Sequence, residues 1–113
     1  MFSTFPLISR YLQGTCASSP HEARLGKEEF GGEVHVYAPA YTEKDMEELL
    51  PLVNHISFNS INQWQLHRKK VQDSSRQLRC GLRINPQYSE VKVELYNPCA
   101  PNSRLGITLE ELK

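Results

Sequence analysis

The sequence of 113 residues lacks the features that mark several large classes of protein. Neither charge is in surplus, since 13 basic residues balance 13 acidic ones, so the composition does not favour nucleic acid as a partner. No apolar run approaches the roughly 18 residues that a membrane span needs. The N-terminal segment has neither the basic start nor the long apolar core of a signal peptide. We therefore expect a cytoplasmic protein with no nucleic-acid or membrane partner.

Motifs for metal, redox and nucleotide chemistry are missing as well. The three cysteines, Cys16, Cys80 and Cys99, are scattered, and no C-x-x-C pair occurs. The four histidines lack the spacing of zinc ligands, so no metal site is expected. Glycine-rich nucleotide loops and the nucleophile elbow of serine hydrolases are absent too. Free thiols in a reducing compartment are the expected state of the cysteines.

What the sequence does contain is a repeated alternation of strand-like and helix-like segments. Small or β-branched runs predict strands, and each is followed by polar capping residues and an apolar periodicity typical of a helix. Ser19 with Glu22, and Ser60 with Gln63, have the spacing of capping boxes. The predicted strands are 15–18, 34–38, 55–58 and 78–84, and the predicted helices are 5–12, 20–30, a helix from 42, 60–71 and the start of one at 108.

This alternation predicts an α/β fold with a parallel sheet and right-handed crossovers. Two architectures fit it: a small open doubly wound sheet, or part of a (β/α)₈ barrel, which runs to about 250 residues. The chain begins in a predicted helix and ends as another starts. We therefore predict that residues 1–113 are an internal fragment of a (β/α)₈ barrel, with about four parallel strands.

In such a fold, ligands meet the carboxyl ends of the strands. Arg83 ends the fourth strand, where it requires either an acidic partner such as Glu22 or an anionic ligand. Glu22 is otherwise explained by the capping box, and Cys16 by a small buried position. The four histidines are interpreted as surface or strand residues. The proline-rich stretch 85–103 is predicted to be irregular, and long ordered loops are often functional.

Three stretches of the chain resemble the carboxynorspermidine (carboxyspermidine) decarboxylase family. They are Thr-Cys-Ala-Ser-Ser at 15–19 continuing to 26, Glu-Val-His-Val-Tyr-Ala-Pro-Ala-Tyr at 33–41, and Cys-Gly-Leu-Arg-Ile-Asn-Pro at 80–86 with Tyr-Asn-Pro-Cys-Ala-Pro at 96–101 and Ser-Arg-Leu-Gly-Ile at 103–107. The resemblance implies a pyridoxal 5′-phosphate enzyme of the alanine racemase type. Such an enzyme has a (β/α)₈ barrel followed by a β-domain and works as a homodimer that forms norspermidine or spermidine.

The resemblance also implies roles for five residues near the cofactor. Glu22 matches an acidic residue close to the cofactor lysine, and Ser19 matches a small polar residue. Cys16 stands where relatives often place an aspartate, which leaves an acid–base role there open. Arg83 matches an arginine beside the cofactor's phenolic oxygen, and Arg104 a basic residue pointing to the same site.

The same resemblance implies that the catalytic groups lie outside this chain. The Schiff-base lysine is expected upstream of Met1, and the ring-stacking histidine, the phosphate-binding glycines and the β-domain downstream of Lys113. We therefore expect residues 1–113 to be inactive alone. Two alternatives remain open: a non-catalytic carrier or regulatory protein that binds pyridoxal phosphate, and a remnant that is stable only with its missing parts.

Overall fold

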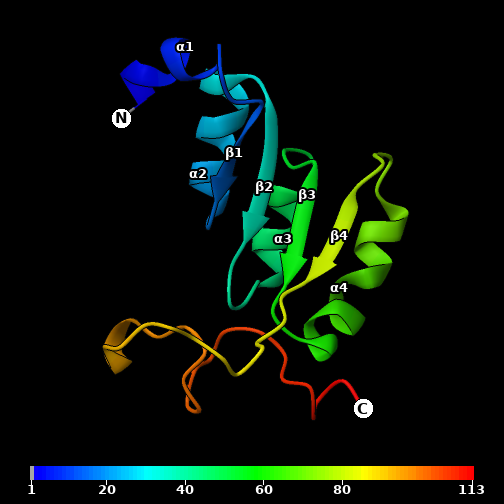
Figure 1. The fold of residues 1–113 in the computed structure, drawn as a ribbon. Helices are drawn as coiled ribbons and strands as arrows, with labels where there is room; N and C mark the ends of the chain where they lie inside the picture. Colours follow the sequence, from blue (N-terminus) through cyan, green and yellow to red (C-terminus); the bar gives the residue numbers. More distant parts are fainter. Residues whose placement is uncertain (1) are drawn as a thin grey trace.

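A computed structural model describes residues 2–113 as a four-stranded parallel sheet with helices packed against it (Figure 1). Strand order follows chain order, β1-β2-β3-β4, and every neighbouring pair is parallel. Its elements are η1 (Phe2–Thr4), α1 (Phe5–Ile8), β1 (Gly14–Ala17), α2 (Pro20–Leu25), the π-helical η2 (Gly26–Phe30), β2 (Glu33–Tyr37), α3 (Glu43–Leu49), β3 (His55–Phe58), α4 (Ile61–Asp73), β4 (Arg79–Leu82) and η3 (Glu94–Tyr96).

The strand order decides between the two architectures that the sequence allows. An open doubly wound sheet reverses its strand order at one point, which places helices on both faces. Here the order never reverses, and α2, α3 and α4 lie on the same side of the sheet (Figure 1). After β4, Ile84 pairs in parallel with Ile107, so the chain continues in the same direction. This arrangement confirms the predicted partial barrel.

The core lies between the sheet and the helices. Alternate residues of the strands, such as Val34, Val36, Ile56 and Phe58, are fully buried, as the two-residue period of a strand requires. The helices contribute the apolar periodicity that the sequence predicts. Members of this core cluster from the helices and their connections are Ala23, Tyr41, Met46, Leu49, Val53 and Val71.

The opposite face of the sheet carries polar side chains. His35 and His55 are register partners on β2 and β3, and their rings stack with centroids 5.4 Å apart. His35 Nε2 lies 2.9 Å from Ser57 Oγ, and His55 Nε2 lies 3.2 Å from Glu33 Oε2. Burial, and then the imidazole of His55, lower the pKa of His35. In a closed barrel this face lines the interior.

Several local predictions are wrong in detail. The first α-helix ends at Ile8 rather than residue 12, and the segment from Thr108 forms turns rather than a helix. His67, expected at the surface, is fully buried because it lies on the face of α4 that packs on Phe58.

No helix among the described residues combines the length and the apolar character that crossing a membrane requires.

Candidate functional site

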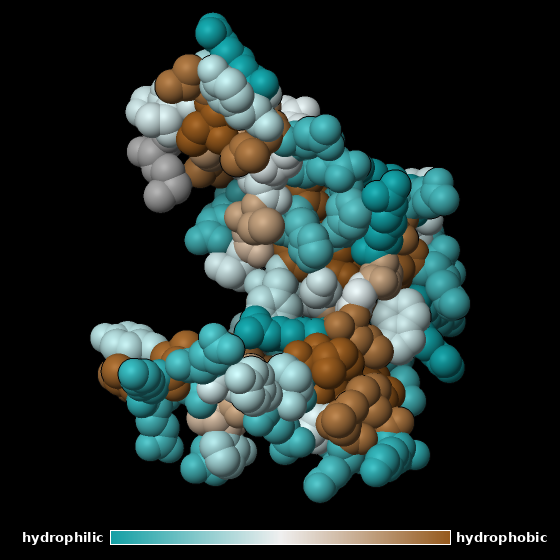
Figure 2. All heavy atoms as spheres, in the orientation of Figure 1, coloured by the Kyte–Doolittle hydropathy of each residue, from teal (hydrophilic) through white to brown (hydrophobic). Residues whose placement is uncertain are grey.

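The carboxyl ends of the four strands lie at one edge of the sheet, and the chain after β4 passes beside them (Figure 1). Residues 85–103 are irregular apart from the short η3, as the prolines predict. The space-filling view shows the molecule hollowed on one side, between its N-terminal helices and this long segment (Figure 2). Every residue that the sequence singles out for binding lies in or next to this edge.

At the end of β1, Ser19 and Glu22 form most of the predicted capping box. Ser19 Oγ accepts a hydrogen bond from the backbone N–H of Glu22 at 3.3 Å. The Glu22 carboxylate does not return to the Ser19 backbone. It accepts from both the N–H and the hydroxyl of Ser18, at 2.7 and 2.8 Å, because Ser18 offers two donors together. These bonds lower the pKa of Glu22, so a fixed negative charge stands at this strand end.

Cys16 is exposed, which corrects its interpretation as a small buried residue. It is the register partner of His35 and therefore lies on the polar face of the sheet, away from the helices. No helix covers this face among the described residues, and the thiol stays open to solvent.

Arg83 follows β4 and stacks on a tyrosine instead of pairing with Glu22. Its Cζ lies 4.7 Å from the centroid of the Tyr37 ring. Within residues 2–113 no carboxylate lies within ion-pair distance of this guanidinium. The alternative of a structural ion pair is therefore wrong for the part of the chain described, and the charge is held by an aromatic face.

Asn59 connects this arrangement to the loop that carries Arg104. Its Oδ1 accepts from the Tyr37 hydroxyl at 2.8 Å and from the Gly106 N–H at 2.7 Å, and its Nδ2 donates to the Arg104 carbonyl at 2.8 Å. Asn59 follows the predicted strand 55–58, but no motif in the sequence assigns it a role. Its partners lie 22 to 47 residues away, and no short motif signals such a contact.

Arg104 is exposed, with its side chain beside a hollow of about 600 Å³ between the first turn of α4 and the loop before Ile107. The neighbouring loop is stabilised locally: Asn97 Oδ1 accepts from the Cys99 N–H at 2.9 Å, and Ser103 Oγ donates to the Pro98 carbonyl at 2.6 Å. The asparagine and serine of the family-like loop thus shape its turns.

Tyr37 and Asn59 connect Arg83 to the backbone of Arg104, but both arginines are kept apart from the β1 residues. Parallel strands are spaced by about 4.8 Å, so the ends of β1 and β4 are separated by about 14 Å. Cys16, Ser19 and Glu22 therefore lie at one side of the strand ends, and the two arginines at the other.

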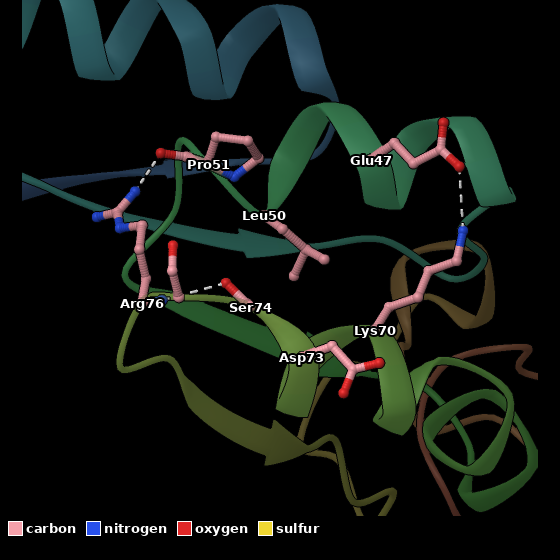
Figure 3. A pocket seen from close by; sticks show the side chains of 8 residues that line it. Glu47, Leu50, Pro51, Lys70, Asp73, Ser74 and Arg76 are labelled. Carbon is pink, nitrogen blue, oxygen red and sulfur yellow. Dashed lines mark hydrogen bonds and ion pairs between the residues drawn. The ribbon is translucent and has the colours of Figure 1, made fainter.

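A second hollow lies at the opposite end of the sheet, between α3 and α4 (Figure 3). Lys70 donates to Glu47 at 3.2 Å across it, and Arg76 donates to the Pro51 carbonyl. The two cationic side chains of this hollow therefore already have partners. Because ligands of βα folds bind at the carboxyl ends of the strands, we place the candidate site at the other end.

The described residues hold no group of three or more His, Cys, Asp or Glu side chains arranged for a metal ion. The most distinctive chemical feature of the site is the guanidinium of Arg83. Its ring contact leaves the N–H donors in the guanidinium plane free. This arrangement suits an anionic oxygen of a ligand, such as a phenolate, phosphate or carboxylate.

Comparison with known proteins shows similarity over almost the whole chain. No protein-family model matches it. Carboxyaminopropylagmatine decarboxylase of Synechocystis is 50 % identical over 95 % of the chain. The carboxynorspermidine/carboxyspermidine decarboxylases of Campylobacter jejuni and Herminiimonas arsenicoxydans are 38 % and 37 % identical over 95 % and 93 %.

A solved structure agrees with this similarity. The crystal structure of Campylobacter jejuni carboxynorspermidine decarboxylase in complex with norspermidine matches 99 % of the chain with a TM-score of 0.83 and 30 % identity. The chain spans 27 % of the length of that structure and 27–28 % of the curated relatives. The chain is thus similar, in sequence and in fold, to one segment of the carboxynorspermidine/carboxyspermidine decarboxylases, and this segment makes up about a quarter of their length.

Proposed function

We propose that this chain is a barrel segment of an enzyme that removes a carboxylate from a carboxylated polyamine. The observation that carries the proposal is the identity of 37–50 % over at least 93 % of the chain with three decarboxylases of such compounds. The matching fold supports it, because the candidate site stands at the strand ends where a barrel binds its ligands.

Pyridoxal 5′-phosphate is the cofactor we propose for this reaction. Its pyridine ring accepts the electron pair left behind when carbon dioxide departs. The residues of this chain fit such an anionic group, because Arg83 lies on the Tyr37 ring and no carboxylate of residues 2–113 takes up its N–H donors. Arg83 would bind an anionic oxygen, and Glu22, kept ionised by Ser18, would supply a negative charge at the far side of the strand ends.

Ser19, Cys16 and Arg104 complete the proposed cofactor-binding set. Ser19 orients Glu22 by capping its helix, Cys16 opens onto the polar face of the sheet, and Arg104 lines the hollow beside Asn59. We assign no catalytic residue to this chain. The same proposal takes residues 1–113 as an internal fragment of the pyridoxal phosphate-binding (β/α)₈ barrel domain. It also includes a β-domain elsewhere, a homodimer and a cytoplasmic location. Three free cysteines suit a reducing compartment.

The substrate has three candidates within this class. Carboxynorspermidine and carboxyspermidine are named by two relatives, and carboxynorspermidine is named by the solved structure as well. Carboxyaminopropylagmatine is named by the Synechocystis relative, whose identity of 50 % exceeds the 38 % and 37 % of the others. That difference is the observation that favours carboxyaminopropylagmatine as the second candidate function.

The test uses the complete gene product, purified and incubated with pyridoxal phosphate and each of the three carboxylated polyamines in turn. Carbon dioxide release and the mass of the product are followed, and kcat/KM ranks the substrates. We expect turnover of at least one compound, with loss of exactly one carboxylate per molecule. Cofactor binding without turnover of any of the three would favour the carrier or regulatory alternative and overturn the proposed enzyme.

A further inference from the structure

Asn59 occupies a position in which every polar atom of its side chain has a partner. Oδ1 accepts two hydrogen bonds, from Tyr37 Oη and Gly106 N, and Nδ2 donates to the Arg104 carbonyl. Its backbone N–H donates to Gln63 Oε1 at 2.9 Å, which anchors the residue to the first turn of α4. The amide plane is therefore fixed from three sides, and Asn59 in turn fixes what it binds.

One of its partners is the hydroxyl of Tyr37, at the end of β2. The tyrosine ring is tethered at one end by the strand and at the other by Asn59. Arg83 lies on this ring, and cation–π contacts depend on the ring lying beneath the charge. The orientation of the guanidinium is therefore linked to Asn59 through the tyrosine.

The loop that Asn59 holds also fixes the backbone of Arg83. The Ile107 N–H donates to the Arg83 carbonyl at 2.8 Å, and the Asn85 N–H donates to the Ile107 carbonyl at 2.8 Å. Gly106 makes this approach possible, because its φ is 86° and a Cβ there would lie 2.9 Å from Asn85 N. Asn59 thus acts on Arg83 by two routes, one through the ring and one through the loop.

The contacts of Arg83 leave the N–H donors of its guanidinium able to bind a ligand. Stacking uses the flat face of a guanidinium and leaves its N–H donors pointing outward in the plane. No carboxylate of residues 2–113 takes up these donors. A cation held in one orientation with free donors pays little ordering entropy when it binds an anion.

We propose that Asn59 and Tyr37 are positioning residues that orient Arg83 toward an anionic oxygen of the bound ligand. They act through Arg83 and do not themselves touch the reacting atoms. The inference rests on the proposed function only for the identity of the anion: an oxygen of the pyridoxal phosphate cofactor or the carboxylate of the substrate.

A double-mutant cycle in the complete gene product tests this role. The variants are Asn59→Ala, Tyr37→Leu and Arg83→Met, alone and in pairs with Arg83→Met. Two quantities are measured for each: the Kd for pyridoxal phosphate, by equilibrium dialysis, and the KM for the best substrate. An effect on Kd assigns the anion to the cofactor, and an effect confined to KM assigns it to the substrate.

We expect Arg83→Met to weaken binding about 30-fold, because the variant loses one set of charge-assisted hydrogen bonds to the anion. Tyr37→Leu should weaken it about fivefold by removing the ring contact, and Asn59→Ala about threefold by releasing the ring and the loop. In the Arg83→Met background, both second substitutions should change binding less than about twofold, because coupled residues are non-additive. Tyr37→Phe, which keeps the ring, should lose less than Tyr37→Leu.

Matched controls separate positioning from general damage. Tyr88→Leu alters a tyrosine that is 70 % exposed in the long loop, and Gln72→Ala alters an exposed amide side chain near the C-terminal end of α4, away from the hollow beside Arg104. Both should leave Kd and KM unchanged. Hydrogen exchange of the peptide containing Gly106 should accelerate in Asn59→Ala, since that substitution removes the acceptor of its N–H.

Full effects of Tyr37→Leu and Asn59→Ala in the Arg83→Met background would overturn the inference, because the residues would then act without the arginine. Unchanged binding in all three single variants would overturn it too. If the gene product converts none of the carboxylated polyamines, the proposed function fails. The double-mutant cycle measured on the Kd for pyridoxal phosphate still decides the role of Asn59 and Tyr37.

Discussion

The buried imidazole of His67 is bonded to the backbone of Tyr41, with Nε2 3.2 Å from the tyrosine carbonyl oxygen. This contact joins α4 to the loop that follows β2. Tyr41 in turn accepts a hydrogen bond from the Ala38 N–H and donates to the Ser57 carbonyl through its hydroxyl, both at 2.9 Å. Burial raises the pKa of Tyr41 to about 12. His67 thereby stabilises the connection between two strand ends of the candidate site.

We expect His67→Ala to lower the free energy of unfolding by about 2–4 kcal/mol, because it leaves a cavity and an unpaired carbonyl in the core. The ring also stacks on Phe58, with centroids 6.4 Å apart, and this contact is lost. Urea unfolding of the complete gene product measures the change. His21→Ala, at an exposed position, is the matched control, and an equal loss in both variants would contradict the proposed role.

The stability of the protein should fall as the pH drops through the titration range of His35. Burial and the neighbouring His55 lower the pKa of His35 below its usual 6.5. Below about pH 6.5, the unfolded chain therefore binds a proton that the folded chain excludes, so the contribution is complete above that pH and is lost below it. Carboxylates with a lowered pKa, such as that of Glu22, make the stability depend on pH only below their usual pKa of 4.5.

His35→Gln should flatten this dependence between about pH 7 and about pH 5, since it removes the titrating group. Urea unfolding at a series of pH values provides the comparison, with His21→Gln as the control at an exposed position. If the slope in this range survives in His35→Gln, another group is responsible for it.

Gly106→Ala should destabilise the protein more than Gly31→Ala. Both glycines have positive φ, 86° and 79°, so both substitutions carry the backbone cost of about 1–2 kcal/mol. Only at Gly106 would the new Cβ also press on backbone atoms, with Asn85 N at 2.9 Å, whereas nothing lies within 4 Å at Gly31. Thermal unfolding of both variants ranks them, and an equal loss would show that the loop can move aside.

Replacement of Arg83 should impair ligand binding in a way that a charge alone does not restore. Arg83→Ala is expected to weaken cofactor binding or slow decarboxylation by at least about tenfold. Arg83→Lys should recover little, because an ammonium lacks the flat face that stacks on Tyr37 and the fixed fork of donors. Arg24→Ala, exposed on α2, serves as the control. Full activity with an intact fold in Arg83→Ala would remove Arg83 from the site.

Local patterns in the sequence predict the elements well, because caps and periodicity act over a few residues. Ser19 and Ser60 cap their helices as the spacing predicts. The side chains of the third residue in each helix do not complete a capping box. Glu22 accepts from the Ser18 N–H, and Gln63 accepts from the Asn59 N–H. In both cases the side chain reaches the residue before the cap.

The partners of Arg83, Asn59 and His67 are not predictable in this way. Asn59 meets Gly106 across 47 residues, and His67 meets Tyr41 across 26. Such contacts depend on how strands and loops are placed relative to one another, which spacing along the chain does not encode. The sequence therefore predicts that the charge of Arg83 requires a partner, but it does not predict that Tyr37 is this partner.

The contacts within the polar face of the sheet determine whether another layer of the protein can cover it. Glu33, His55, His35 and Ser57 already bond or stack among themselves. A layer laid over them would cover Nε2 of both imidazoles, Oγ of Ser57 and Oε2 of Glu33 in contacts that are already made, and burying groups that are already bonded costs far less than burying free ones. The face can therefore be shielded from water and remain polar. This suits it to an interior that contains little water, where electrostatic interactions are strong.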